Sequence, residues 1–189
     1  MKIFACDSTA KTASVALCED NILLAEFTQN GGNTHSETLL PMTEVLLNSM
    51  KTDIDEIDIF AVSEGPGSFT GVRIGVSLIK GLAFDKNKPC IGVSTLDALA
   101  FNLDGIGGYV VPVMDARREQ VYTAIFKDGE RLSEDMLVPI SELRDKLLAL
   151  GATQIRLCGD GYGVAKKYFS DSDTKKDKMG LIVPEDILK

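Results

Sequence analysis

The sequence predicts an α/β protein in which one β-β-β-α-β-α unit occurs twice. Two apolar, strand-like stretches indicate the duplication, because each ends at an aspartate (Asp7 or Asp115) and is followed by two further strand-like segments. In each half a helical segment then leads to a strand that ends in glycine, at Gly65 or Gly159. The repeated order predicts two subdomains of one fold, which we divide into residues 1–103 and 104–189.

The first half contains four predicted strands and two predicted helices. Apolar runs bounded by turn-forming residues place the strands at 3–6, 14–18, 22–27 and 59–65. The first helix is expected over residues 36–50, and its start is marked by a capping box formed by Thr34 and Glu37. The second helix is expected over residues 72–84. Apolar residues cover most of the circumference of both helices, so each has more than one apolar face.

The second half follows the same order with weaker patterns. Strands are predicted at 109–114 and 121–126, and a less distinct third strand follows the turn at 127–129. A helix over 141–150 stops at Gly151, and a strand runs from 155 to 159. The polar, mixed-charge segment 171–178 is expected to be a solvated loop rather than a tRNA-binding patch.

Composition limits the functional classes. The 189 residues include 44% hydrophobic residues, which is enough to build a core, and the formal net charge is −8. An acidic chain of this kind lacks the basic footprint of proteins that bind nucleic acid on their own. No apolar run approaches the length of a membrane span, and no signal-peptide pattern follows Lys2. We therefore expect a soluble, cytoplasmic protein.

The few cysteines and the single histidine argue against metal and redox sites. Cys6, Cys18, Cys90 and Cys158 are all far apart in sequence, without a C-x-x-C pair, and each adjoins an apolar run. We expect four buried, reduced thiols. The only histidine, His35, stands in a polar segment where a role at a helix start is favoured over catalysis. A site with several histidine ligands is impossible.

A glycine-rich string joins the fourth strand to the second helix. It reads Gly65-Pro66-Gly67-Ser68-Phe69-Thr70-Gly71-Val72-Arg73-Ile74-Gly75. Backbone N–H groups at such a junction suit a phosphate, a carboxylate or a closely packed partner. The string is neither a Walker A loop nor a dinucleotide fingerprint, because the spacing of both motifs fails. A tight turn that requires glycine geometry is the alternative, and both interpretations stay open.

The duplicated unit, with an aspartate after each first strand, resembles the actin-like ATPase (ASKHA, ribonuclease H-like) fold. In that superfamily the two aspartates, matched here by Asp7 and Asp115, hold phosphates and metal; the alternative is that each only forms a turn. A glycine usually follows two residues later, where this chain has Thr9 and Arg117. The resemblance thus implies a degraded nucleotide site that binds ATP or ADP weakly or not at all. Its candidate residues are Asp7, Ser8, Thr9, Asp115 and Gly159.

Four segments carry a closer resemblance. They are Ile3–Thr9, His35–Pro41, Gly65–Gly75 and Val113–Arg118. Together they resemble the TsaB (YeaZ) family, the non-catalytic partners of TsaD in bacterial synthesis of the tRNA base threonylcarbamoyladenosine. The resemblance extends over nearly the whole chain. It implies a scaffold or dimerisation subunit that supports threonylcarbamoyl transfer to the tRNA adenosine next to the anticodon.

Two positions separate this chain from the catalytic paralogue. TsaD-like proteins bind a metal through two histidines after the strand that follows the glycine-rich loop and its helix. The corresponding places here hold Thr95 and Leu99, and neither side chain can replace imidazole at a metal. The resemblance therefore implies no metal, no catalytic residue and no enzymatic activity of the chain by itself.

The two helices of the first half are the predicted partner-binding elements. In the TsaB family they form a helical bundle with TsaD, and the same surface makes homodimers when TsaD is absent. The candidate contact residues are Leu39, Leu40, Leu47, Val72, Gly75, Val76, Ile79 and Ala83, with Val76 and Ile79 the first choice for the outward stripe. Complete burial of these helices within the subdomain is the alternative.

The resemblance also implies that the ATPase TsaE joins the assembly. The net charge of −8 predicts that the chain does not bind tRNA tightly by itself. A different class of function stays open. An active phosphotransferase or ATPase would use Asp7 and Asp115 around magnesium and nucleotide, and would turn over ATP without a partner. A peptidase has little support, because the chain lacks a histidine pair for zinc.

Overall fold

The computed structural model describes residues 1–31, 34–84 and 86–172. These residues divide into two compact units between Thr95 and Leu96. Sequence reasoning placed the boundary after residue 103, whereas helix α3 (Thr95–Phe101) lies almost wholly in the second unit. Contacts of α3 explain the difference: Asp97 forms an ion pair with Arg131, and the Cys158 thiol lies 3.5 Å from the Leu99 carbonyl oxygen.

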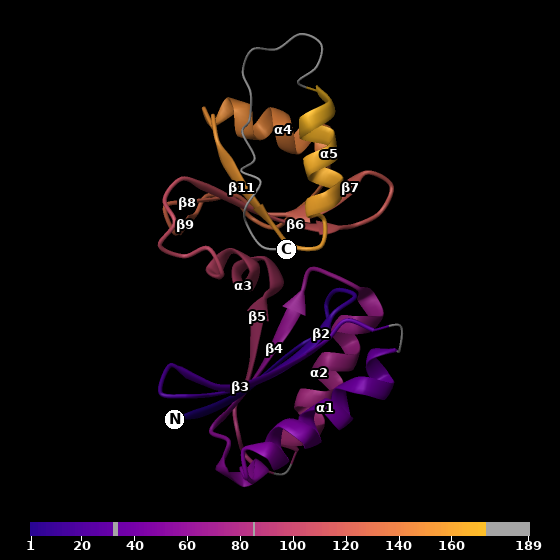
Figure 1. Cartoon of the computed structure of the whole chain (residues 1–189), viewed down its shortest axis with the longest axis vertical. Coiled ribbons are helices and arrows are strands. Elements are labelled where there is room, and N and C mark those ends of the chain that lie inside the picture. The colour runs from indigo at the N-terminus through magenta and orange to yellow at the C-terminus, as the bar shows by residue number, and fades with distance from the viewer. Residues whose placement is uncertain (32–33, 85, 173–189) are drawn as a thin grey trace. The chain divides into compact units, whose positions relative to one another are not determined.

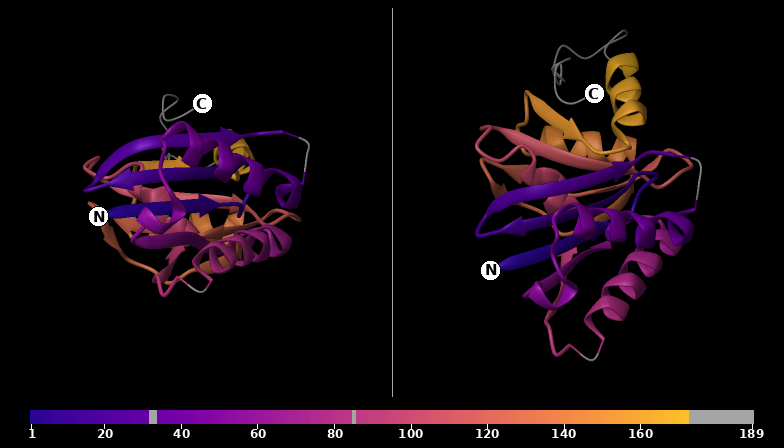
Figure 2. Two further views of the ribbon diagram at one scale, coloured as in Figure 1. Left: turned by 90° about the horizontal axis from the view of Figure 1, so that it is seen from below. Right: turned by 60° about the horizontal axis from the view of Figure 1, so that its bottom comes forward.

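The first unit is a five-stranded mixed sheet with two helices on one face (Figure 1 and Figure 2). The strand order is β3-β2-β1-β4-β5, with β1 antiparallel to β2 and parallel to β4. The strands are β1 (Lys2–Asp7), β2 (Ala13–Glu19), β3 (Ile22–Gln29), β4 (Ile59–Gly65) and β5 (Cys90–Ser94). The helices are α1 (His35–Ser49), the short 3-10 helix η1 (Ile54–Glu56) and α2 (Phe69–Ala83).

The core of this unit is formed by strands in which buried side chains alternate with less buried ones. In β1, Phe4 and Cys6 are buried while their neighbours are only half-buried, as the two-residue period of a strand requires. The register aligns Phe4 with Leu17 and with Phe60, so the buried residues of adjacent strands share one face. Helices α1 and α2 cover that face and add apolar side chains to the same core: Leu39, Met42, Leu46, Ile79 and Ala83.

Helix starts differ in detail from the predictions. Thr34 does precede α1, but the predicted capping box is wrong, because the Thr34 hydroxyl lies 3.0 Å from the Ser36 hydroxyl and caps no backbone N–H. Helix α2 begins at Phe69 rather than Val72. Its N-cap is Ser68, whose hydroxyl accepts a hydrogen bond from the Gly71 amide at 3.2 Å.

The second unit repeats the order of the first, as the sequence predicted. Its central strand β6 is antiparallel to β7 and parallel to β11, and β10 pairs with the other edge of β7. The predicted strand 121–126 ends earlier, and a small hairpin, β8–β9, is inserted before the third strand of the repeat. The elements are β6 (Tyr109–Asp115), β7 (Gln120–Thr123), β8 (Phe126–Lys127), β9 (Glu130–Arg131), β10 (Met136–Pro139), α4 (Ile140–Ala149), β11 (Ile155–Cys158) and α5 (Tyr162–Ser172).

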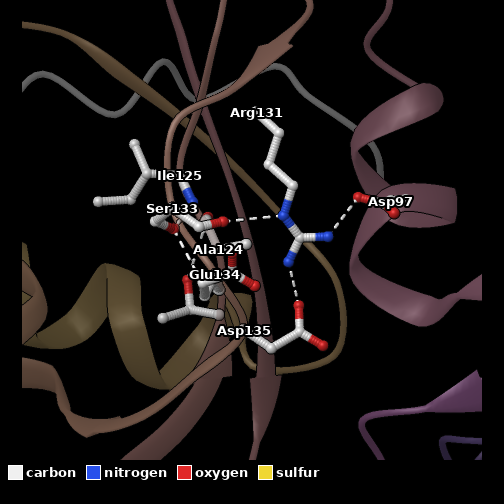
Figure 3. Close-up of polar contacts among 8 residues, drawn as sticks. Asp97, Ala124, Ile125, Arg131, Ser133, Glu134 and Asp135 are labelled. Atoms are coloured by element: carbon white, nitrogen blue, oxygen red, sulfur yellow. Dashed lines mark hydrogen bonds and ion pairs between the residues drawn. The ribbon is translucent and has the colours of Figure 1, made fainter.

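Arg131 ties the inserted hairpin to helix α3 (Figure 3). Its guanidinium donates to the Asp97 carboxylate at 2.7 Å, to the Ser133 carbonyl at 2.8 Å and to the Asp135 carboxylate. The ring of Phe126 lies beneath the guanidinium, with its centroid 5.5 Å away. One side chain thus joins three segments of the unit, and the planar geometry of arginine makes such simultaneous contacts favourable.

None of the described helices is long and apolar enough to cross a membrane. Of the polar segment 171–178, the backbone of residues 171 and 172 forms the end of α5. The rest of that predicted loop lies outside the described residues.

Candidate partner-binding face

The glycine-rich string packs against the turn that follows β1. The Ser68 amide donates to the Thr9 carbonyl at 2.7 Å, and the Ser8 hydroxyl donates to the Gly71 carbonyl at 2.8 Å. A Cβ on Gly71 would lie 2.0 Å from the Ser8 carbonyl oxygen, and one on Gly67 would lie 2.5 Å from the Thr9 carbonyl oxygen. The glycines are therefore needed for close backbone packing within the chain.

This contact agrees with the tight-turn interpretation of the string. Ser8 and Thr9 are almost completely buried, and their backbone occupies the space beside the loop. Gly75 belongs to the same contact, because its Cβ would lie 2.6 Å from the Ser8 hydroxyl. A tight intrachain approach accounts for these glycines without a bound phosphate.

The Asp7 carboxylate, a predicted nucleotide-site residue, makes hydrogen bonds within its own unit. One oxygen accepts from both the amide and the hydroxyl of Thr9 at 2.7 Å, and the other accepts from the Ser63 hydroxyl at 2.9 Å. These bonds hold the turn after β1 against β4. These contacts are those of a turn-forming aspartate.

In the second unit, the turn after β6 resembles the turn after β1 in the first unit. Asp115 is exposed, and its carboxylate accepts from the Arg117 amide at 2.8 Å. Gly159 has a positive φ of 100°, and a Cβ there would lie 2.3 Å from the Val113 carbonyl oxygen. Glycine is therefore required at this position by backbone geometry and by close approach.

The structure decides which stripe of α2 faces outward. Gly71, Gly75, Ile79 and Ala83 are its buried residues, and Leu39 of α1 is also in the core. Four candidate contact residues, Leu39, Gly75, Ile79 and Ala83, are thus buried, and the expectation that Ile79 faces outward is corrected. Val72 and Val76 are half-buried, as is Leu47. The exposed stripe of α2 holds Arg73, Ser77, Lys80 and Phe84.

Large apolar side chains are exposed on these two helices. Phe69 of α2 and Phe84, the C-cap residue of that helix, are 70% and 80% exposed, and Leu40 and Val45 of α1 are 48% and 51% exposed. Exposed aromatic and aliphatic side chains on adjacent helices are typical of surfaces that bind another protein. Leu40 is the one predicted contact residue that lies clearly on this outer face.

A groove of about 460 Å³ runs between α1 and α2. Its apolar lining comes from both helices and includes Leu40, Ile74 and Leu78. At its edge the Arg73 guanidinium lies 3.7 Å from the centroid of the Phe69 ring, a cation–π contact. The full lining is His35, Ser36, Leu39, Leu40, Phe69, Thr70, Arg73, Ile74, Ser77 and Leu78. We call this surface the α1–α2 groove.

The single histidine lies at the start of α1, as predicted. His35 Nε2 lies 2.8 Å from the Ala10 carbonyl oxygen, which requires Nε2 to be the donor. The contact joins the start of α1 to the β1–β2 turn. Sequence reasoning did not select Phe69 or Arg73 as binding residues.

The positions that correspond to the TsaD metal ligands are apolar or buried here. Thr95 is buried, and its hydroxyl has no hydrogen-bond partner among the described residues. Leu99 is half-buried on α3. Within residues 1–31, 34–84 and 86–172, no three His, Cys, Asp or Glu side chains are grouped as a metal site.

The four thiols differ in their burial, whereas the sequence predicted that all four would be buried. Burial raises the pKa of Cys6 and of Cys158 to about 12, so both stay protonated and unreactive near neutral pH. Cys18 is half-buried and Cys90 is exposed, which corrects the expectation of four buried thiols. Cys90 is the first residue of β5, in which the residues are exposed apart from the half-buried Ser94.

Comparison with known proteins identifies the family. The model of the family described as "TsaD: tRNA N6-adenosine threonylcarbamoyltransferase" matches residues 23–175. The chain belongs to the TsaD family. Within this family it groups with the TsaB (YeaZ) proteins, which confirms the resemblance seen in the sequence.

Two curated TsaB proteins illustrate the similarity. Both are named tRNA threonylcarbamoyladenosine biosynthesis protein TsaB. The chain is 36% identical to that of Bacillus subtilis (strain 168), over 72% of this chain and 60% of the relative. It is 38% identical to that of Escherichia coli (strain K12), over 69% of this chain and 57% of the relative. The matches thus span about three fifths of the length of these relatives.

Solved structures of YeaZ proteins support the actin-like, ribonuclease H-like fold. YeaZ from Pseudomonas aeruginosa superposes with a TM-score of 0.66 and 30% identity, over 74% of this chain and 68% of that chain. A second structure, of an uncharacterized protein with similarity to the peptidase YeaZ, has a TM-score of 0.72 and 23% identity, over 97% of both chains. At that identity the second match concerns the fold alone.

Proposed function

We propose that this chain is a non-catalytic scaffold subunit that binds TsaD through the outer face of α1 and α2. In that role it supports threonylcarbamoyl transfer to the tRNA adenosine next to the anticodon. The observation that carries the proposal is the α1–α2 groove, whose apolar lining includes the exposed side chains Leu40 and Phe69. The names of the TsaB relatives supply the biosynthetic context.

Two features support a role without catalysis. The places of the paralogue's histidine ligands hold Thr95 and Leu99, so the chain lacks imidazoles that would bind a Lewis-acid metal. The glycine-rich loop is packed on the backbone of Ser8 and Thr9, which crowds the approach of a phosphate. We propose that the chain needs no cofactor and binds ATP or ADP weakly at most.

We propose that the outer face of α1 and α2 forms both the heterodimer and the homodimer. TsaD forms a heterodimer with the chain, and in the absence of TsaD a second copy covers the face. TsaE joins the assembled complex. Tight binding of tRNA by the chain alone is not expected, because a net charge of −8 provides little release of counterions from phosphates.

Size-exclusion chromatography of the chain with TsaD from the same organism tests the proposal. Leu40→Arg places a charge in the interface and should abolish the complex, because an unpaired buried charge costs several kcal/mol, on the order of 3–5. Leu150→Arg is the matched control: Leu150 ends α4 and is 45% exposed, against 48% for Leu40. Both variants should melt like the wild type. If the wild-type chain and TsaD elute separately, the proposal is wrong.

Activity measurements provide an independent test. The chain alone should neither transfer the threonylcarbamoyl group nor hydrolyse ATP, and it should bind tRNA with no better than micromolar affinity at physiological salt. ATP turnover that disappears in Asp7→Asn would replace the scaffold role with that of a phosphotransferase or ATPase. Weak nucleotide binding without turnover agrees with the proposal.

A further inference from the structure

The Phe69–Arg73 pair combines an exposed aromatic ring with a charge that lacks an acidic partner. The guanidinium lies on the ring face at 3.7 Å, and Arg73 forms no ion pair within the part of the chain that the structure describes. Both side chains line the α1–α2 groove. Stacking fixes the guanidinium plane while its N–H edges stay available for hydrogen bonds.

The charge of helix α2 is opposite to that of the whole chain. The protein has 28 acidic and 20 basic residues, yet the 15 residues of α2 include no Asp or Glu and two cations, Arg73 and Lys80. The groove lining also contains no carboxylate. Phe69 is the first residue of α2, where the helix dipole adds partial positive charge. The α2 side of the groove is therefore complementary to an anion.

We infer that Phe69 and Arg73 form a receptor for a carboxylate carried by a helix of the TsaD subunit. The planar guanidinium fork binds a carboxylate with two parallel hydrogen bonds, which fixes both position and orientation. Apolar residues that flank the carboxylate on the partner helix would pack on Leu40, Ile74 and Leu78. The inference rests on the proposed function. It adds the feature of the partner that this surface would recognise, which is one Asp or Glu between apolar side chains on a helix of TsaD.

The test is the affinity of the chain for TsaD, measured by calorimetry at about 50 mM and about 500 mM NaCl, concentrations between which screening increases strongly. Arg73→Gln should weaken binding at least about tenfold at low salt, because charge-assisted pairs in interfaces contribute more than neutral ones. Arg73→Lys should lose part of the affinity, since lysine keeps the charge but not the planar fork. Arg73→Gln should also make binding less dependent on salt.

Lys80→Gln is the control. Lys80 is an exposed cation on the same helix but outside the groove lining, so its loss should change affinity by less than about threefold. Arg73 is exposed, and thermal melts should confirm that all three variants fold. If Arg73→Gln did not fold, Arg73→Lys and the salt dependence of the wild type would decide the question.

Failure of the inference can be separated from failure of the proposed function. If the wild-type chain binds TsaD and Arg73→Gln binds equally well with the same salt dependence, the carboxylate receptor is refuted while the scaffold role stands. If Arg73→Gln weakens only self-association of the chain, the carboxylate belongs to a second copy and the assignment to TsaD is overturned. If the wild type does not bind TsaD at all, both proposals fail.

Discussion

A single methyl group on Gly71 should disrupt the first unit. Gly71 is in the first turn of α2, and its carbonyl accepts the Ser8 hydroxyl at 2.8 Å. In Gly71→Ala the new Cβ would lie 2.0 Å from the Ser8 carbonyl oxygen, far inside the 3.4–4 Å of an ordinary van der Waals contact. The obstacle is backbone, so no side-chain rotation can relieve it, and α2 would have to move away from β1.

Three effects contribute to the change that Gly71→Ala should make in the free energy of unfolding. Overpacking of this kind typically costs about 1–3 kcal/mol or more. Displacement of α2 would also weaken the buried hydrogen bond of Ser8, a loss of about 1 kcal/mol. Alanine favours a helix over glycine by up to about 1 kcal/mol, which offsets part of the loss. The net destabilisation should be about 1–4 kcal/mol, equivalent to a decrease in Tm of at least about 4 °C for a unit of this size.

Gly81→Ala is the matched comparison. Gly81 is in the same helix, but a Cβ there would meet nothing within 4 Å. Only the helix-propensity term applies, so this variant should be more stable than the wild type by about 0.5–1 kcal/mol. Urea unfolding followed by circular dichroism gives both free energies. If Gly71→Ala is as stable as the wild type, or if both alanines shift stability in the same direction, the close approach of α2 to β1 is refuted.

Further predictions concern the thiols and the second unit. Under brief alkylation at neutral pH, Cys90 should react first, while Cys6 and Cys158 should stay unmodified until the chain unfolds, because burial holds their pKa values near 12; mass spectrometry of peptides checks the order. Arg131→Ala removes three polar contacts and should lower the free energy of unfolding by about 2 kcal/mol, whereas Asp97→Asn should cost less than about 1 kcal/mol because the pair is partly exposed. Equal losses in denaturant melts would contradict this ranking.

The identities and spacing of residues were sufficient for much of the fold. Each first strand ends at its aspartate, Asp7 or Asp115, and the duplicated order of elements is present in both units. Strand and helix patterns are local, so a period of two or of 3.6 residues can be read without knowledge of distant contacts. The second unit was predicted less accurately, since its inserted hairpin β8–β9 has strands of only two residues each.

The candidate binding face was only partly predictable. The sequence identified α1 and α2 as helices with excess apolar surface, but it selected Ile79 for the outside, and Ile79 is buried. A helix that is apolar around most of its circumference has no unique buried side. The packing of Gly71 and Gly75 against the turn after β1 sets the rotation of α2, and this contact joins residues 63 positions apart in the chain.

The sequence by itself determined the residues that are present: a single histidine, Thr95 and Leu99 at the two positions where the resemblance to TsaD places histidines, and a net negative charge. These are properties of composition and position that folding does not change. The tertiary structure alone decided why the loop needs its glycines and that Arg73 stacks on Phe69 at the edge of a groove. Both depend on how α2 is rotated against the sheet, which long-range packing sets and local sequence periodicity does not encode.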